Sequence, residues 1–65
     1  MARMTKLVLT FPESKTAQQF SGWLYLEGYT DRVLDQNTVT VEVPYDERDK
    51  IIEEAESRNG RLDRE

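Results

Sequence analysis

The side chains that most often do chemistry in proteins are scarce in this 65-residue chain. It has no cysteine and no histidine, so it lacks thiolates, the commonest zinc ligand and the commonest general base. Its adjacent carboxylates, such as Glu53 and Glu54, do not face each other on a helix. No serine has a plausible activating base. The sequence therefore predicts a protein that is not an enzyme and that has no metal site and no cofactor.

The candidate functional residues are then those that could contact another macromolecule. An exposed aromatic and aliphatic cluster on a helix, or an apolar strand edge, can anchor a protein interface. The protein-contact candidates are Lys6, Val8, Thr10, Trp23, Tyr25 and Leu26. The alternative for Trp23 is a place at the margin of the core, and the alternative for Leu26 is that it turns inward where the helix unwinds. A second hypothesis is a nucleic-acid-associated protein whose small basic patch contains Lys6, Lys15 and Arg32.

Two elements must position these side chains. Residues 6–11 alternate in a pattern rich in strand formers and predict a first strand. A helix follows, with Ser14 as its cap or Thr10 in a capping box, and it ends at Gly28. Its apolar stripe consists of Ala17, Phe20 and Leu24. Gly22 lies inside this helix, where its missing side chain is expected to let a neighbouring backbone approach closely.

The second half of the chain predicts a hairpin and another helix. Residues 29–35 form the expected second strand. Because Val33 and Leu34 are adjacent, the sequence does not decide which of them faces the core. Residues 38–43 alternate valine with polar side chains and give the clearest strand. The short turn between these strands indicates an antiparallel hairpin. A second helix follows, with Asp46 as its N-cap.

The resulting order is β-α-β-β-α. A right-handed crossover leaves a gap between strands one and two, and strand three can enter it, which gives the strand order 1-3-2 with both helices on one face. We expect a truncated ferredoxin-like split β-α-β fold of class α+β that lacks its last strand. It forms a single small domain, residues 1–65, with frayed ends at about 1–4 and 61–65.

The missing strand suggests how the protein makes contacts. Strand one is the most apolar strand, and its open edge invites pairing with another chain. We expect either a homodimer through strand one or pairing with an extended segment of a partner protein; the alternative is a monomer whose edge Arg3 and Lys6 protect. A small-molecule-sensing dimer is a third hypothesis, since dimers of such folds can enclose a pocket.

The charge and composition of the chain argue against two classes of partner, nucleic acids and membranes. The chain has 9 basic and 13 acidic residues, a net charge of −4, which argues against binding a phosphate backbone. The strand faces expected to lie away from the helices offer no aromatic side chain in strands one and three on which bases could stack. No apolar run reaches the length of a membrane span, and no signal peptide is evident. These features predict a cytoplasmic protein without membrane contact.

One segment resembles a known group of proteins. Residues 14–24, followed by Glu27, Gly28 and Tyr29, carry alanine, phenylalanine, tryptophan and leucine in a helical pattern that ends at a glycine. This pattern resembles the opening helix of small uncharacterised proteins encoded by tailed bacteriophages, and it covers about a third of the chain. The resemblance implies an accessory phage protein in the host cytoplasm. It implies no activity and no site residues.

Overall fold

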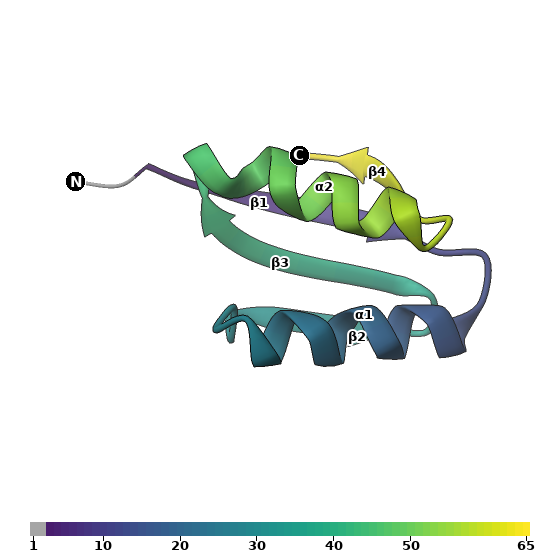
Figure 1. Ribbon diagram of the computed structural model, residues 1–65. Coiled ribbons are helices and arrows are strands. Elements are labelled where there is room, and N and C mark those ends of the chain that lie inside the picture. Colours follow the sequence, from purple (N-terminus) through teal and green to yellow (C-terminus); the bar gives the residue numbers. More distant parts are fainter. Residues whose placement is uncertain (1–2) are drawn as a thin grey trace.

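The computed structural model describes residues 3–65. It has two layers, a four-stranded antiparallel sheet and two α-helices that cover one face of it (Figure 1). The elements are β1 (Met4–Thr10), α1 (Ser14–Leu26), β2 (Arg32–Asp35), β3 (Thr38–Pro44), the 3₁₀ turn η1 (Tyr45–Glu47), α2 (Arg48–Ser57) and β4 (Arg61–Arg64). The predicted α+β class is confirmed.

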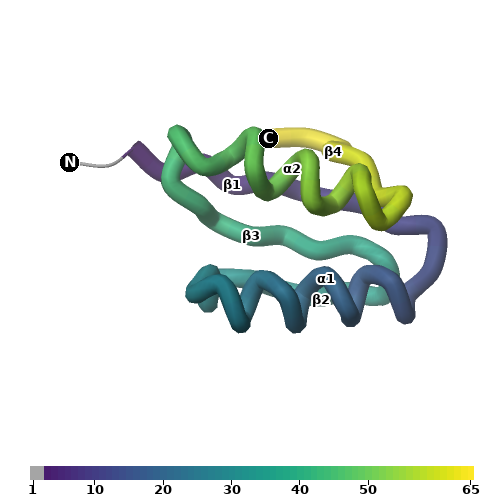
Figure 2. Tube along the Cα trace, viewed as in Figure 1, coloured from purple at the N-terminus to yellow at the C-terminus, as the bar shows by residue number. Residues whose placement is uncertain are grey.

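The number of strands was predicted wrongly. Residues 61–64, expected to be frayed, form β4, which pairs antiparallel with β1 on the side away from β3. Figure 2 shows the first and last strands running side by side. The strand order is β2-β3-β1-β4, so the predicted central order holds but β1 lies inside the sheet. Of the other residues expected to fray, Met4 belongs to β1, and residues 1–2 lie outside the described part of the chain.

The core fills the space between the sheet and the helices. Its buried apolar residues are Leu7, Leu9, Phe11, Ala17, Phe20, Leu24, Val39, Val41, Val43, Ile51 and Ala55. Alternate residues of β1 and β3 supply the sheet side, as the period of two predicts. Phe11 and Phe20 have ring centroids 5.0 Å apart, which joins the end of β1 to α1.

The helix starts differ from their predictions. The N-cap of α1 is Glu13, whose side chain makes no capping hydrogen bond, so neither Ser14 nor Thr10 is the cap. The turn η1 precedes α2 and moves its N-cap to Glu47, one residue beyond the predicted Asp46. The end of α1 is as predicted, because Gly28 adopts a φ of 95°, a conformation that glycine takes at little cost.

The β2–β3 hairpin is tied to β1 by the residue that ends its turn. The Nδ2 atom of Asn37 donates a 2.8 Å hydrogen bond to the carbonyl oxygen of Phe11. The backbone N–H of Phe11 donates in return to the carbonyl oxygen of Asn37, also at 2.8 Å. This reciprocal pair fixes where the hairpin lies relative to the first strand.

The end of β4 is held by charge-assisted hydrogen bonds. Arg48 donates from Nε and Nη2 to the two carboxylate oxygens of Glu65, at 2.8 and 2.6 Å. The hydroxyl of Thr5 donates to Glu65 Oε2 at 2.8 Å. Residue 65 thereby joins β1 to the start of α2, and these bonds hold the pKa of the Glu65 carboxyl below its usual range.

Candidate protein-contact surface

The three strand-one candidates do not lie on an open edge. Residues 8–10 of β1 pair with β4, which corrects the expectation that strand one is an edge. Lys6, Val8 and Thr10 face away from the helices, opposite Glu42, Thr40 and Thr38 of β3 respectively. These side chains therefore belong to the uncovered face of the sheet. A homodimer through the whole edge of strand one would have to displace β4.

The three helix-one candidates divide into two environments. Trp23 is half-buried and stacks on Phe20, with ring centroids 5.7 Å apart, so it belongs to the margin of the core. Tyr25 is exposed, and the guanidinium of Arg32 lies over its ring, 5.0 Å from the centroid. Leu26 is 81% exposed, so the inward-turned alternative is wrong. Tyr25 and Leu26 are therefore both accessible at the end of α1.

The open apolar edge of the sheet is β2, which the predicted order 1-3-2 also placed at an edge but which supplied no protein-contact candidate. β2 has only four residues and pairs with β3 on one side. Its central apolar residues are both exposed, Val33 to 63% and Leu34 to 39%. The opposite edge strand, β4, carries charged side chains at all positions but Leu62, and charge is a common protection against edge pairing. Of the two edges among residues 3–65, β2 is the one with an apolar centre.

The register between β2 and β3 determines which side chains of β2 face the helices and which lie on the uncovered face. Arg32 pairs with Val41 and Leu34 with Val39, so both side chains face the helix layer. Consistent with this, Arg32 Nε donates a 3.0 Å hydrogen bond to Ser21 Oγ on α1. Val33 therefore lies on the uncovered face of the sheet, which settles the ambiguity that the adjacent apolar pair had left.

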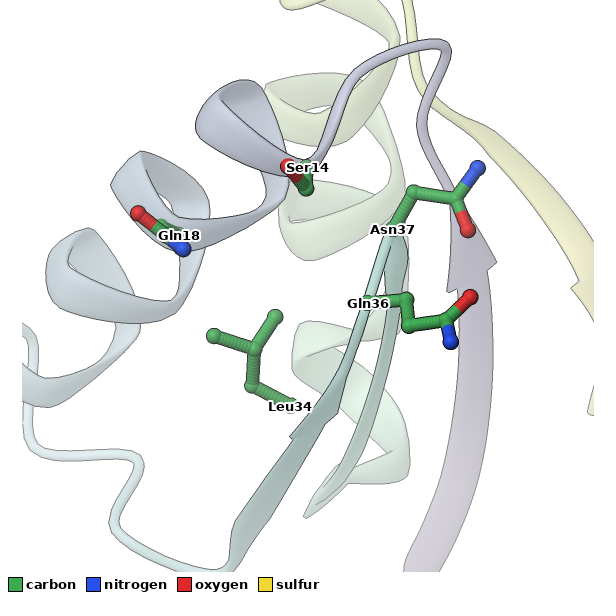
Figure 3. A pocket seen from close by; sticks show the side chains of 5 residues that line it. All are labelled: Ser14, Gln18, Leu34, Gln36 and Asn37. Atoms are coloured by element: carbon green, nitrogen blue, oxygen red, sulfur yellow. The ribbon is translucent and has the colours of Figure 1, made fainter.

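A shallow hollow lies between the β2 edge and α1. Figure 3 shows the side chain of Leu34 projecting from β2 toward Gln18 of α1, with Ser14 above it. Gln36 and Asn37, at the hairpin turn, complete the lining. Exposed aliphatic carbon at the base and amide groups at the rim can accept an apolar side chain and the backbone that carries it.

The residues of the predicted basic patch are not brought together. Lys6 lies on the uncovered sheet face, whereas Arg32 faces α1 and Lys15 is exposed on α1. Instead, β4 adds arginines to the uncovered face, where Arg64 pairs with Val8 and lines a hollow with Lys6. These arginines were not among the candidates, because residues 61–64 were expected to fray instead of forming β4.

Tyr29, at the margin of the core, has a raised pKa. The hydroxyl of Tyr29 donates a hydrogen bond to Glu47, and Lys50 lies 3.4 Å from a carboxylate oxygen of Glu27. Burial, followed by the hydrogen bond and charge of Glu47, raises the pKa of Tyr29 to about 12. A phenol that is harder to ionise is a poor general base at neutral pH, so we interpret this cluster as a structural link between the loop after α1 and the turn η1.

Residues 3–65 also lack two further features. No group of three or more acidic, histidine or cysteine side chains is arranged to hold a metal ion there. Within the same residues, no helix is long and apolar enough to cross a membrane. In comparisons of the whole chain with protein-family models, with curated proteins and with solved structures, nothing matches.

Proposed function

We propose that this chain is a non-catalytic protein-binding module that contacts other polypeptides through the edge of β2 and the adjoining end of α1. The observation that carries the proposal is the unpaired edge of β2 with two exposed apolar residues, Val33 and Leu34, at its centre. An edge strand offers unsatisfied backbone groups to any extended chain, and pockets beside it provide selectivity.

The exposed end of α1 supports the same surface. Tyr25 is on the helix beside Arg32 of β2, and Leu26 follows it with most of its side chain exposed. Tyrosine is enriched among residues that dominate binding energy. The resemblance of residues 14–24 and 27–29 to small phage proteins agrees with an accessory role of this kind, and a phage origin is part of the proposal.

An unbiased peptide-display selection tests this function. We expect enriched peptides that bind the native protein and lose binding to a double variant, Tyr25→Ser with Val33→Ser. A matched variant, Gln19→Ala with Glu53→Ala, changes two exposed helix residues that do not line the hollow beside β2 and should bind as the native protein does. Sedimentation equilibrium over a wide concentration range shows whether a second copy is the partner. If nothing is enriched and the protein stays monomeric, the proposed function is wrong.

A second candidate function rests on the uncovered sheet face. Lys6 and Arg64 line a hollow there together with Thr40, and basic groups of this kind can contact phosphates. Glu42 is directly opposite Lys6, however, and the net charge is −4. Salt-dependent binding to single-stranded DNA or RNA that Arg64→Ala weakens would favour this function; no binding at low salt would exclude it.

A further inference from the structure

We propose that the β2 edge binds an extended polypeptide segment that carries two basic residues four positions apart with apolar residues between them. This inference rests on the proposed protein-binding function and specifies the chemistry of the partner. It follows from the direction of three sets of groups on β2: its backbone, its helix-facing side chains and its carboxylates.

The backbone of β2 has free groups at alternate residues. The N–H of Glu42 donates to the carbonyl oxygen of Asp31 at 3.0 Å, and the register continues through Val33 opposite Thr40. In an antiparallel ladder, hydrogen-bonded pairs alternate with pairs whose backbone groups point away. Arg32 and Leu34 therefore direct their N–H and C=O groups toward the open edge, where an added strand can pair with them.

The side chain of Leu34, one of the two residues whose backbone groups point toward the open edge, selects for an apolar group in the added strand. Leu34 projects toward α1 and forms the floor of the hollow that Gln18 and Ser14 border (Figure 3). A residue of the added strand directly opposite Leu34 places its Cβ about 4.5 to 5.5 Å from that of Leu34. An aliphatic side chain at this position enters the hollow and covers the exposed part of Leu34. The residue beside it, opposite Val33, covers the apolar centre of the uncovered face.

The carboxylates of β2 select for basic groups. Asp31, the residue just before β2, continues the ladder opposite Glu42. Asp31 and Asp35 therefore flank Val33 on the uncovered face, since side chains two residues apart share a face of a strand. Glu42, the partner of Asp31, adds a third carboxylate to that face. Opposite charges directly across a ladder stabilise pairing and like charges oppose it. Lysine or arginine opposite Asp31 and Asp35 is therefore favoured in the partner.

A second copy of this chain fits the edge less well. A two-fold antiparallel pairing centred on Val33 places Asp31 opposite Asp35 of the other copy, twice. Pairing centred on Leu34 places Asp35 opposite Val33 of the other copy, and pairing centred on Arg32 juxtaposes two guanidinium groups. Each register sets like charges, or a carboxylate and an apolar group, against each other, so the edge suits a basic partner better than itself.

Two synthetic peptides test the proposal on the full chain. The first has the sequence Ser-Lys-Leu-Val-Thr-Lys-Ser, and the second replaces both lysines with glutamate. Titration followed by amide chemical shifts should show the basic peptide binding roughly tenfold more tightly, because two attractive pairs become two repulsive ones. The shifts should be confined to β2, to the facing side of α1 and to the hairpin turn.

A charge-reversed protein provides the matched control. In the double variant Asp31→Lys with Asp35→Lys, two exposed side chains change, and the preference should reverse so that the acidic peptide binds more tightly. Equal binding of both peptides to either protein, no binding at millimolar concentration, or shifts centred on Lys6 and Arg64 would overturn the proposal. Display-selected peptides of other composition at the same edge would overturn it too, while leaving the proposed protein-binding function intact.

A proline variant separates backbone pairing from side-chain contact. Because the N–H of Leu34 points outward, Leu34→Pro removes a group that the β2–β3 ladder does not use, and proline is tolerated on edge strands. Leu34→Ala removes the side chain alone. The proline variant should bind the basic peptide at least several-fold more weakly than the alanine variant, with an unchanged circular dichroism spectrum. Equal affinity of the two folded variants would contradict strand addition.

Discussion

Adding one methyl group at Gly22 and at Gly60 should change the stability of this domain in opposite directions. Gly22 lies inside α1, and a Cβ built there has no atom within 4 Å. Alanine at such a position gains about 1 kcal/mol over glycine from helix propensity. Because the added methyl neither collides nor packs, we expect Gly22→Ala to stabilise the fold by nearly that amount. This also corrects the expectation that Gly22 allows a close backbone approach.

Gly60 has the opposite environment, between α2 and β4. A Cβ there would lie 2.5 Å from Phe11 Cε2 and 2.9 Å from the carbonyl oxygen of Ala55, whereas carbon atoms prefer separations of about 3.5 to 4.0 Å. Phe11 is 1% exposed, so its ring has no free space to enter. Overpacking of this kind costs about 1 to 3 kcal/mol. The reduced entropy of the unfolded chain offsets about 0.4 to 1 kcal/mol, so the middle of the two ranges leaves a net destabilisation of about 1.3 kcal/mol.

Urea denaturation and thermal melting of both variants measure these effects, with the fluorescence of Trp23, the single tryptophan, as the probe. In a domain of this size 1 kcal/mol corresponds to about 4 to 8 °C in Tm. Gly22→Ala should melt higher than the native protein, and Gly60→Ala lower. A Gly60→Ala variant as stable as the native protein would refute the close packing of Phe11 and the Ala55 carbonyl around Gly60, and a destabilised Gly22→Ala would refute the open environment of Gly22.

Three further predictions concern hydrogen bonds that link distant elements. Asn37→Ala removes the amide that ties the hairpin to β1 and should lower the free energy of unfolding, measured by urea titration, by about 1 kcal/mol. Asn37→Asp should recover none of this stability, since a carboxylate supplies no donor. The pKa of Tyr29 is about 12 in the folded protein, against an ordinary value of 10.0. Unfolded chains therefore release this proton at lower pH, and the free energy of unfolding should fall as the pH rises from 10 to 12. Tyr29→Phe should abolish this pH dependence and lose the bond to Glu47. Glu65→Gln weakens the ion pair with Arg48 and should speed amide exchange in β4 at pH 7; equal exchange at pH 7 would show that this pair does not hold β4. The lowered pKa of Glu65 adds stability only where the carboxyl is ionised. That stability is lost as the pH falls from the ordinary carboxyl value of 4.5 through the lowered pKa, so native and variant should converge only below the lowered pKa.

The sequence predicted the central part of the fold because its strongest patterns are local. Alternating valines define β3, and the helical stripe that includes Phe20 defines α1. The β2–β3 pairing follows from a short turn, which needs no information from distant residues. These elements and their order were therefore accessible without a structure.

β4 was missed because its local signal is weak. Three of its four residues are charged and only Leu62 is apolar, so no hydrophobic alternation marks it as a strand. It forms because the edge of β1 is available to it and because Glu65 bonds to Arg48 and Thr5. Such a strand is defined by its tertiary contacts. The turn residue Gly60 and the apolar Leu62 two positions later were the signals that could have indicated it.

Only the helix part of the candidate surface could be predicted from the sequence, because it depends on local helical spacing. Tyr25 and Leu26 were candidates because their positions on the helix lie away from the apolar stripe, but their exposure stayed open until the structure showed it. The predicted order placed strands one and two both at edges and the contact edge was expected at strand one, but β4 covers that strand and leaves β2 open. With Val33 and Leu34 adjacent, the alternation of β2 was ambiguous, and only the register with β3 determines which of them faces the helices.

The antiparallel pairing of β1 with β4 also determines how the domain responds to force. Because Arg64 lies beside Val8 and the two strands run in opposite directions, the start of β1 and the end of β4 leave the sheet toward the same side. Tension applied between residues 3 and 65 would separate these strands one hydrogen bond at a time, beginning at the bonds around Glu65, instead of shearing the ladder as a whole. The domain should therefore yield at low force, and the first extension should release β4 while the hairpin of β2 and β3 stays paired.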